Sequence, residues 1–136
     1  MMTVEMKVGR FIEIRGRGVV TQEEMQAFRS RLFALMVKAG RPIVAAVDMR
    51  GLAPFDDTVR GMFVGLMRGD NPHVERSAHL AEAGSAYHQQ AVEMITLAGN
   101  PSRKLFSEVP ELEHWLGERM DDAERAQMKA FLAEPG

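Results

Sequence analysis

The sequence predicts a single α/β domain: a sandwich with a four- to five-stranded mixed or mostly parallel sheet, helices packed on it and an extra C-terminal helix. Short apolar segments alternate along the chain with segments of helical periodicity. Strands that are separated by helices imply right-handed crossovers within one sheet. The chain has 136 residues, 46% of them hydrophobic, which suits one globular core.

The N-terminal third predicts two paired strands and a long helix. Apolar residues alternate with polar ones over residues 4–8, and residues 11–14 lead into a glycine-marked turn at 15–18. Residues 21–24 have the form of a capping box, in which the threonine accepts an amide hydrogen and the glutamate bonds back. Apolar side chains then recur every three or four residues until a glycine and a proline, so a helix is expected over residues 22–39.

The middle of the chain predicts two strand–helix pairs. Residues 42–49 are almost continuously apolar and rich in β-branched side chains, which is typical of a central parallel strand buried on both faces. Residues 56–58 offer N-cap acceptors for a helix that ends near Gly69. A weaker strand is expected at about 76–81, and Ser85 is expected to cap the helix that follows.

The C-terminal part predicts a short edge strand at residues 104–106 and two helices. Pro110 fits the first turn of one helix, and the last helix is expected to begin near Asp121 or Asp122. We divide the chain into an α/β domain at residues 1–120 and an added amphipathic helix and tail at 121–136.

The last helix is predicted to carry an apolar stripe that needs a cover. Its expected apolar side comprises Ala123, Met128, Phe131 and Leu132, and its polar side comprises Glu124, Arg125, Gln127 and Lys129. Met128, Phe131 and Leu132 would form either a docking face on the chain's own domain or the interface of a homodimer.

Composition excludes several classes of function. A net charge of −2 lacks the basic excess that binding to nucleic acid requires. No apolar stretch approaches the length of a membrane span or forms a signal peptide, so a cytoplasmic protein is expected. The absence of cysteine suits a reducing compartment and rules out disulfides and Cys-ligated zinc.

The middle of the chain resembles STAS domains, and in particular the SpoIIAA-like group. The resemblance rests on VDMRGL at residues 47–52 and FDDT at residues 55–58, where Asp57 and Val59 replace a serine and a glycine of the family's pattern. It covers about residues 8–116. It implies an α/β fold related to that of lipid-binding Sec14-type domains, and a regulatory, non-enzymatic role in bacterial signalling.

The resemblance implies a switch at Thr58. In antagonists of anti-sigma factors, the hydroxyl residue at this position is phosphorylated by a kinase partner, and the phosphate controls binding. The alternative is that Thr58 caps the helix. The expected partner-binding surface comprises Arg50, Asp56, Asp57, Thr58 and Arg60. Asp57 could serve there as a permanent negative charge.

Two functions of different classes follow from the sequence. The first is a protein-interaction module that binds an unidentified protein partner. The second is a carrier or sensor that encloses a small apolar ligand between the sheet and its helices. An enzyme is not expected, because no nucleophile, base and orienting group can be aligned. The four histidines, His73, His79, His88 and His114, have no metal-type spacing, so no metal or cofactor is expected.

Overall fold

The computed structural model describes residues 1–134 and shows an α/β sandwich. Its strands are β1 (Met2–Val8), β2 (Phe11–Gly16), β3 (Ile43–Asp48), β4 (Val74–Leu80) and β5 (Arg103–Phe106). Its helices are α1 (Gln22–Ala39), α2 (Asp57–Asp70), the 3₁₀ turn η1 (Asn71–His73), α3 (Ala86–Ala98), α4 (Val109–Gly117) and α5 (Asp122–Ala133). The predicted element order is confirmed, and residues 135 and 136 of the predicted tail lie outside the described residues.

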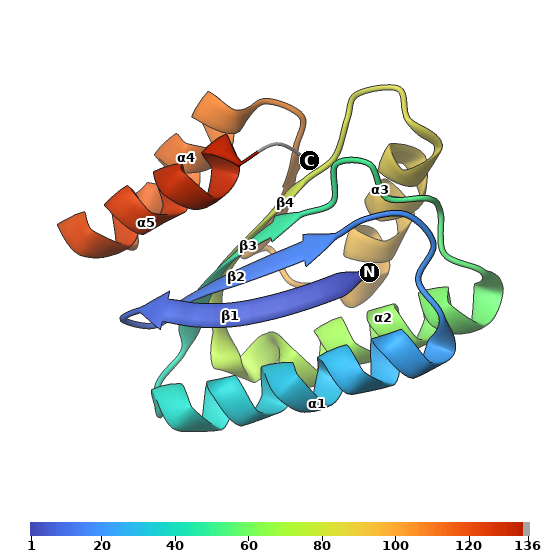
Figure 1. Cartoon of the computed structure of the whole chain (residues 1–136), viewed down its shortest axis with the longest axis horizontal. Helices are drawn as coiled ribbons and strands as arrows, with labels where there is room; N and C mark the ends of the chain where they lie inside the picture. Colours follow the sequence, from blue (N-terminus) through green and yellow to red (C-terminus); the bar gives the residue numbers. More distant parts are fainter. Residues whose placement is uncertain (135–136) are drawn as a thin grey trace.

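The strands form one mixed sheet in the order β1-β2-β3-β4-β5. β1 pairs antiparallel with β2, and every other neighbouring pair is parallel. Helices α1, α2 and α3 lie on one side of this sheet, and α4 and α5 lie on the other (Figure 1). The carboxyl ends of four parallel strands therefore share one edge, which is where loops of α/β proteins commonly bind ligands and partners.

β3 is buried on both faces, as the sequence predicts. Ile43, Ala45 and Val47 belong to the core beneath α1, α2 and α3, while Val44 and Ala46 belong to the core beneath α4 and α5. Successive side chains of a strand point to opposite faces, so a continuous apolar run supplies both cores at once.

α1 and α5 begin at the residues that the sequence indicates, but the reciprocal capping box predicted for α1 is found at α5. The Thr21 hydroxyl accepts the Glu24 amide at 3.1 Å, as predicted. The reciprocal capping box is found instead at α5, where Asp121 and Glu124 each accept the other's backbone amide.

α5 packs on the sheet within the chain, but its buried face is not quite the predicted one. Met128, Phe131 and Leu132 are buried against a core that includes Phe11. Ala123 is exposed and Glu124 is buried, the reverse of the prediction for these two residues. Glu124 tolerates burial because its carboxylate accepts the Asp121 amide at 3.0 Å and the Arg10 amide of the β1–β2 turn at 3.0 Å.

Candidate functional site

The loop between β3 and α2 lies at the carboxyl edge of the sheet and is tied to the loop after β2. The Gly18 amide donates to the Gly51 carbonyl at 3.0 Å, and the Ala53 amide donates to the Gly18 carbonyl at 2.9 Å. Gly51 has φ +79°, which L side chains rarely adopt, and its amide donates to the Glu82 carboxylate at 2.9 Å. These bonds join the three loops that follow β2, β3 and β4.

Phe55, the residue before the N-cap of α2, has both of its backbone polar groups hydrogen-bonded. The Gln90 side chain of α3 accepts the Phe55 amide at 2.8 Å and donates to the Phe55 carbonyl at 2.9 Å. The Phe55 ring is buried edge-on against Phe63 and Tyr87. The entry into α2 is therefore held rigidly before the exposed turn begins.

Asp56 caps α2, and the prediction that Thr58 could do so is wrong. The Asp56 carboxylate accepts the Val59 amide at 2.8 Å. Thr58 is already the second residue of the helix, two positions past the residue whose side chain accepts the first-turn amide. The Asp56, Asp57 and Thr58 side chains are all exposed.

The two predicted arginines occupy different environments. Arg60 is half-buried and pairs with Glu93 of α3 at 3.4 Å. Arg50 is also half-buried, but its guanidinium donates to Asp48 at 2.9 and 3.0 Å and to the Leu132 carbonyl at 3.0 Å. Arg50 therefore joins the β3–α2 loop to β3 and to α5 through hydrogen bonds within the chain.

Asp48 is the centre of a cluster that the sequence did not predict. Its fully buried carboxylate accepts hydrogen bonds from Arg15 at 3.4 Å, Arg17 at 2.9 Å and Arg50. Burial alone would favour the neutral acid, but the hydrogen bonds from Arg50 and Arg17 outweigh it and lower the pKa of Asp48 to about 2. We call these four residues the Asp48 cluster.

The Asp48 cluster also holds the end of α5. Arg15 donates to the Phe131 carbonyl at 2.7 Å, lies 4.3 Å from the centre of the Phe131 ring and pairs with Glu134. Arginines at the carboxyl end of a helix satisfy its last carbonyl groups and its negative dipole end. The cluster thus joins β2, β3, the loops that follow these two strands, and α5.

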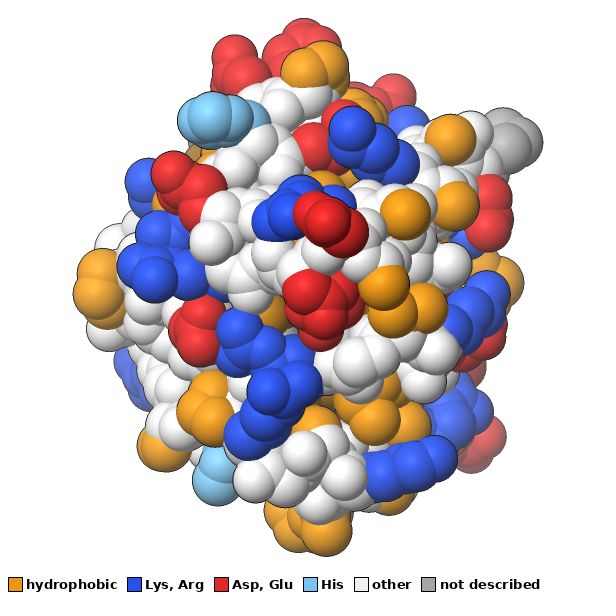
Figure 2. Space-filling view, turned by 90° about the vertical axis from the view of Figure 1, so that its left-hand side faces the viewer, with side chains coloured by type: hydrophobic (Ala, Val, Ile, Leu, Met, Phe, Trp, Pro, Cys, Tyr) orange, Lys and Arg blue, Asp and Glu red, His pale blue; other side chains and the backbone are white. Residues whose placement is uncertain are grey.

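Charge is mixed on the molecule's face seen in Figure 2, which is the left-hand side of Figure 1. Lys and Arg side chains lie next to Asp and Glu across this face, with apolar side chains between them.

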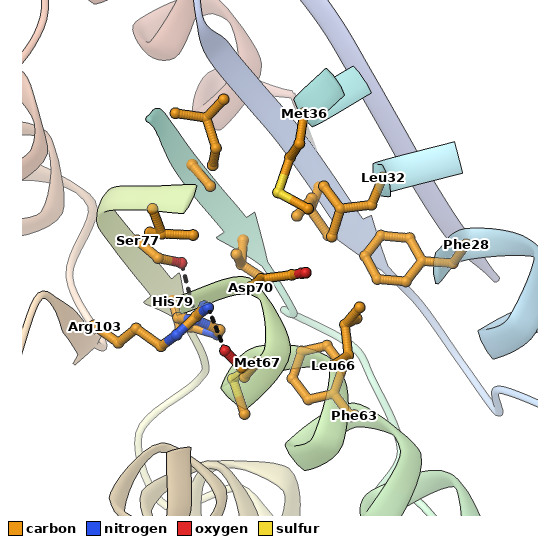
Figure 3. Close-up of a pocket in the computed structure, with 15 residues that line it drawn as sticks. Phe28, Leu32, Met36, Phe63, Leu66, Met67, Asp70, Ser77, His79 and Arg103 are labelled. Atoms are coloured by element: carbon orange, nitrogen blue, oxygen red, sulfur yellow. Dashed lines mark hydrogen bonds between the residues drawn. The ribbon is translucent and has the colours of Figure 1, made fainter. Parts of the chain in front are cut away.

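A small internal cavity lies between the sheet and helices α1 and α2. Its volume is about 30 Å³, enough for about one water molecule. Figure 3 shows Phe28, Leu32 and Met36 of α1 along one side and Ser77, His79 and Arg103 at the other end. The cavity therefore has an apolar side and a polar end.

Ser77 and His79 form the one hydrogen bond between a serine side chain and a histidine ring among residues 1–134. Ser77 Oγ and His79 Nε2 are 3.2 Å apart, and both residues are buried. Burial, together with the nearby charge of Arg103, lowers the pKa of His79 to about 3, so the imidazole is neutral. The described residues provide no carboxylate hydrogen-bonded to this histidine, so an acid–base triad is not assembled.

Within residues 1–134, no group of three or more His, Cys, Asp or Glu side chains could hold a metal ion. Over the same residues, no helix has the length and apolar character needed to cross a membrane.

The comparisons with known proteins give a fold. No family model matches the sequence, and no curated protein matches it significantly. Several solved structures resemble it, and two of them define its fold. The first is an uncharacterised DUF3478-family protein with a SpoIIAA-like fold from Shewanella loihica PV-4: TM-score 0.65, 18% identity, covering 85% of this chain and 92% of that one. The chain has the SpoIIAA-like fold.

The second similar structure is the anti-sigma factor antagonist SpoIIAA in its unphosphorylated form. The TM-score is 0.59 at 13% identity, and the match covers 88% of this chain and 100% of that one. The predicted resemblance to the SpoIIAA-like group is therefore confirmed at the level of the fold.

Sequence reasoning missed the Asp48 cluster and the polar end of the cavity. A signal for the first was present, because Arg15 and Asp48 lie near the carboxyl ends of two predicted strands that a helix separates, and the structure pairs them in parallel register. A signal for the second was the i, i+2 spacing of Ser77 and His79, which puts both on one face of a strand. Arg103 lies beside them only because β5 pairs with β4, and no local sequence pattern indicates that pairing.

Proposed function

We propose that this protein is a non-enzymatic interaction module in a regulatory circuit, and that it binds its protein partner through the first turn of α2. The observation that carries the proposal is an exposed polar turn on a rigid support. Asp57 and Thr58 face solvent, while Asp56, Phe55 and Gln90 fix the backbone beneath them. A surface that is already ordered loses little conformational entropy when a partner binds.

The SpoIIAA-like fold supports the same proposal, since one similar structure is an anti-sigma factor antagonist described in its unphosphorylated form. In this chain Thr58 is an accessible hydroxyl at a helix N-terminus. A phosphate there would lie near the positive end of the helix dipole but also beside Asp56 and Asp57. We propose that modification of Thr58 changes the charge of the turn and thereby the affinity for the partner.

The cytoplasm is the compartment that we propose for this role, in keeping with a sequence that has no cysteine.

The experiment is an affinity pull-down from the source organism's lysate with wild-type, Thr58→Ala and Thr58→Glu baits, followed by mass spectrometry and phosphate mapping. Thr3→Glu is the matched control, because it puts the same charge on an exposed threonine of β1. We expect a partner whose recovery differs between Thr58→Ala and Thr58→Glu but not between wild type and Thr3→Glu. Equal recovery with all four baits would remove the first turn of α2 from the interface.

A second function, the binding of a small apolar ligand, is favoured by the internal cavity alone. Eleven methionines in the chain and the placing of Met36 and Met67 on the cavity give it adaptable walls. This function predicts that apolar ligands raise the melting temperature of the protein. If they do not, this second function is excluded and the partner-binding proposal is unaffected.

A further inference from the structure

The internal cavity contains a buried cation that forms no ion pair. Arg103 is only 8% exposed. Its guanidinium donates to the Asn71 side chain at 3.1 Å and to the Met67 carbonyl at 3.1 Å, both neutral acceptors. Within residues 1–134 no carboxylate pairs with it. A buried charge is costly unless an opposite charge compensates it, so this cavity favours an anion.

The nearest candidate counter-charge within the chain is poorly suited to that task. Asp70 also lines the cavity; burial raises the pKa of its carboxyl above the ordinary value, and the charge of Arg103 opposes that rise. In Figure 3 its carboxyl group points toward Phe28 and Leu32, away from Arg103. Besides Asp70, the polar end of the cavity presents the Arg103 guanidinium and the hydrogen-bonded pair of Ser77 and His79.

The rest of the cavity has the opposite character. Phe28, Leu32 and Met36 of α1 meet Phe63 and Met67 of α2 across it, and all are buried. An apolar cavity with a few convergent polar groups at one end is typical of a ligand site. Its two ends fit a molecule with one anionic group and one apolar chain.

We propose that this cavity binds a small amphipathic carboxylate, with its anionic end on Arg103 and Ser77 and its apolar chain against α1. The proposal rests on the second function above, the binding of an apolar ligand, and adds the chemical class of that ligand. It is independent of the partner surface at Thr58.

Entry requires α2 to move, because the cavity of about 30 Å³ is too small for such a ligand. Leu66 and Asp70 line both the cavity and a surface groove of about 640 Å³ between α1 and α2, so they form the wall between the two. α2 also carries three glycines, Gly61, Gly65 and Gly69, each of which weakens a helix relative to alanine. A Cβ at any of the three would meet nothing within 4 Å, so packing does not require them. Local opening of α2 enlarges the cavity toward the groove.

The test compares octanoate with 1-octanol, which has the same chain and no charge, by titration calorimetry and by amide NMR shifts on the full chain. Arg103→Met removes the cation and keeps an apolar side chain of similar length. We expect octanoate to bind the wild type and to bind Arg103→Met about tenfold more weakly, since a hydrogen bond to a charged group is lost. Binding of 1-octanol should change less than about twofold.

A second pair of variants guards against a folding defect in Arg103→Met. Ala45→Val adds bulk to the cavity wall, while Ala46→Val makes the same change on the opposite face of β3. We expect Ala45→Val to abolish octanoate binding and Ala46→Val to preserve it.

Three results would contradict the account in distinguishable ways. If neither probe binds the wild type, both the ligand function and its proposed class are wrong. If 1-octanol binds but Arg103→Met leaves octanoate affinity unchanged, the site is apolar and the carboxylate class is wrong. If octanoate binds Ala45→Val as well as it binds the wild type, it binds elsewhere on the protein. The pull-down with Thr58 variants is unaffected by any of these results.

Discussion

Replacing Asp48 by asparagine tests whether its cluster holds the sheet edge and α5 together. The asparagine keeps the shape of the side chain but leaves Arg15, Arg17 and Arg50 without their shared carboxylate. Removing one partner of a buried ion pair costs about 3–5 kcal/mol. The lowering of the pKa of Asp48 from 3.8 to about 2 corresponds to about 2 kcal/mol. We therefore expect a loss of about 2–3 kcal/mol in the free energy of unfolding at pH 7.

Urea denaturation as a function of pH is the assay. The folded-state pKa of Asp48 is lower than its unfolded value, so its contribution is present above pH 3.8 and is lost as the pH falls toward about 2. The difference between wild type and Asp48→Asn should shrink over that window. Glu134→Gln is the control, because its exposed ion pair with Arg15 should contribute less than about 1 kcal/mol.

Hydrogen exchange gives a second reading of the same prediction. Arg15 and Arg50, which Asp48 orients, bond the Phe131 and Leu132 carbonyls. Asp48→Asn should therefore speed amide exchange in α5 more than in α1. A variant within about 0.5 kcal/mol of wild type at pH 7, or a difference that persists unchanged below pH 2, would refute the reasoning.

Five further substitutions have expected outcomes, each measured by the free energy of unfolding in urea. Asp56→Ala should cost about 1 kcal/mol because it removes the α2 cap, whereas Thr58→Ala should cost less than about 0.5 kcal/mol; equal costs would contradict the assignment of the cap. Gly65→Ala should add up to about 1 kcal/mol, because its Cβ meets no neighbour, and should slow octanoate exchange measured by NMR; a loss of stability would show an unexpected clash. Tyr87→Phe should be neutral or stabilising, since the buried Tyr87 hydroxyl has no partner within the described chain; a cost above about 1 kcal/mol would reveal one. His79→Gln should reduce the fall in the free energy of unfolding between pH 6.5 and pH 3. In the wild type the unfolded histidine binds a proton below pH 6.5 and the folded one only near pH 3, which gives a slope of up to about 1.4 kcal/mol per pH unit. An unchanged slope would show that other groups cause the acid sensitivity.

The order of elements was predictable because its signals are local. Thr21 and Ser85 cap helices at the positions that the sequence indicates, and the apolar run before Asp48 is the central strand. A cap or a strand pattern depends on residues a few positions apart, so one sequence suffices to detect it.

The misassigned residues depend on distant partners. Glu124 was predicted to face solvent on α5, but it is buried and its carboxylate accepts the backbone amide of Arg10, which lies 114 residues earlier in the chain. The Asp56–Thr58 segment offered several acceptors in a row, and only the backbone conformation shows that Asp56 is the cap.

The candidate sites were predictable to different extents. The first turn of α2 was found through its resemblance to the STAS motif, whereas Arg50, assigned to the same surface, turns inward to Asp48. The cavity could not be located from sequence, because Ser77, His79 and Arg103 meet only through the pairing of β4 with β5.

The most direct test of the central claim is a hydrogen-exchange footprint of the protein bound to its captured partner. The proposal predicts slowed amide exchange in residues 51–60, which form the edge loop and the first turn of α2, with little change in β1 and α5. Protection confined to β1, α4 or α5, with residues 51–60 unchanged, would contradict the claim that this turn is the partner-binding surface.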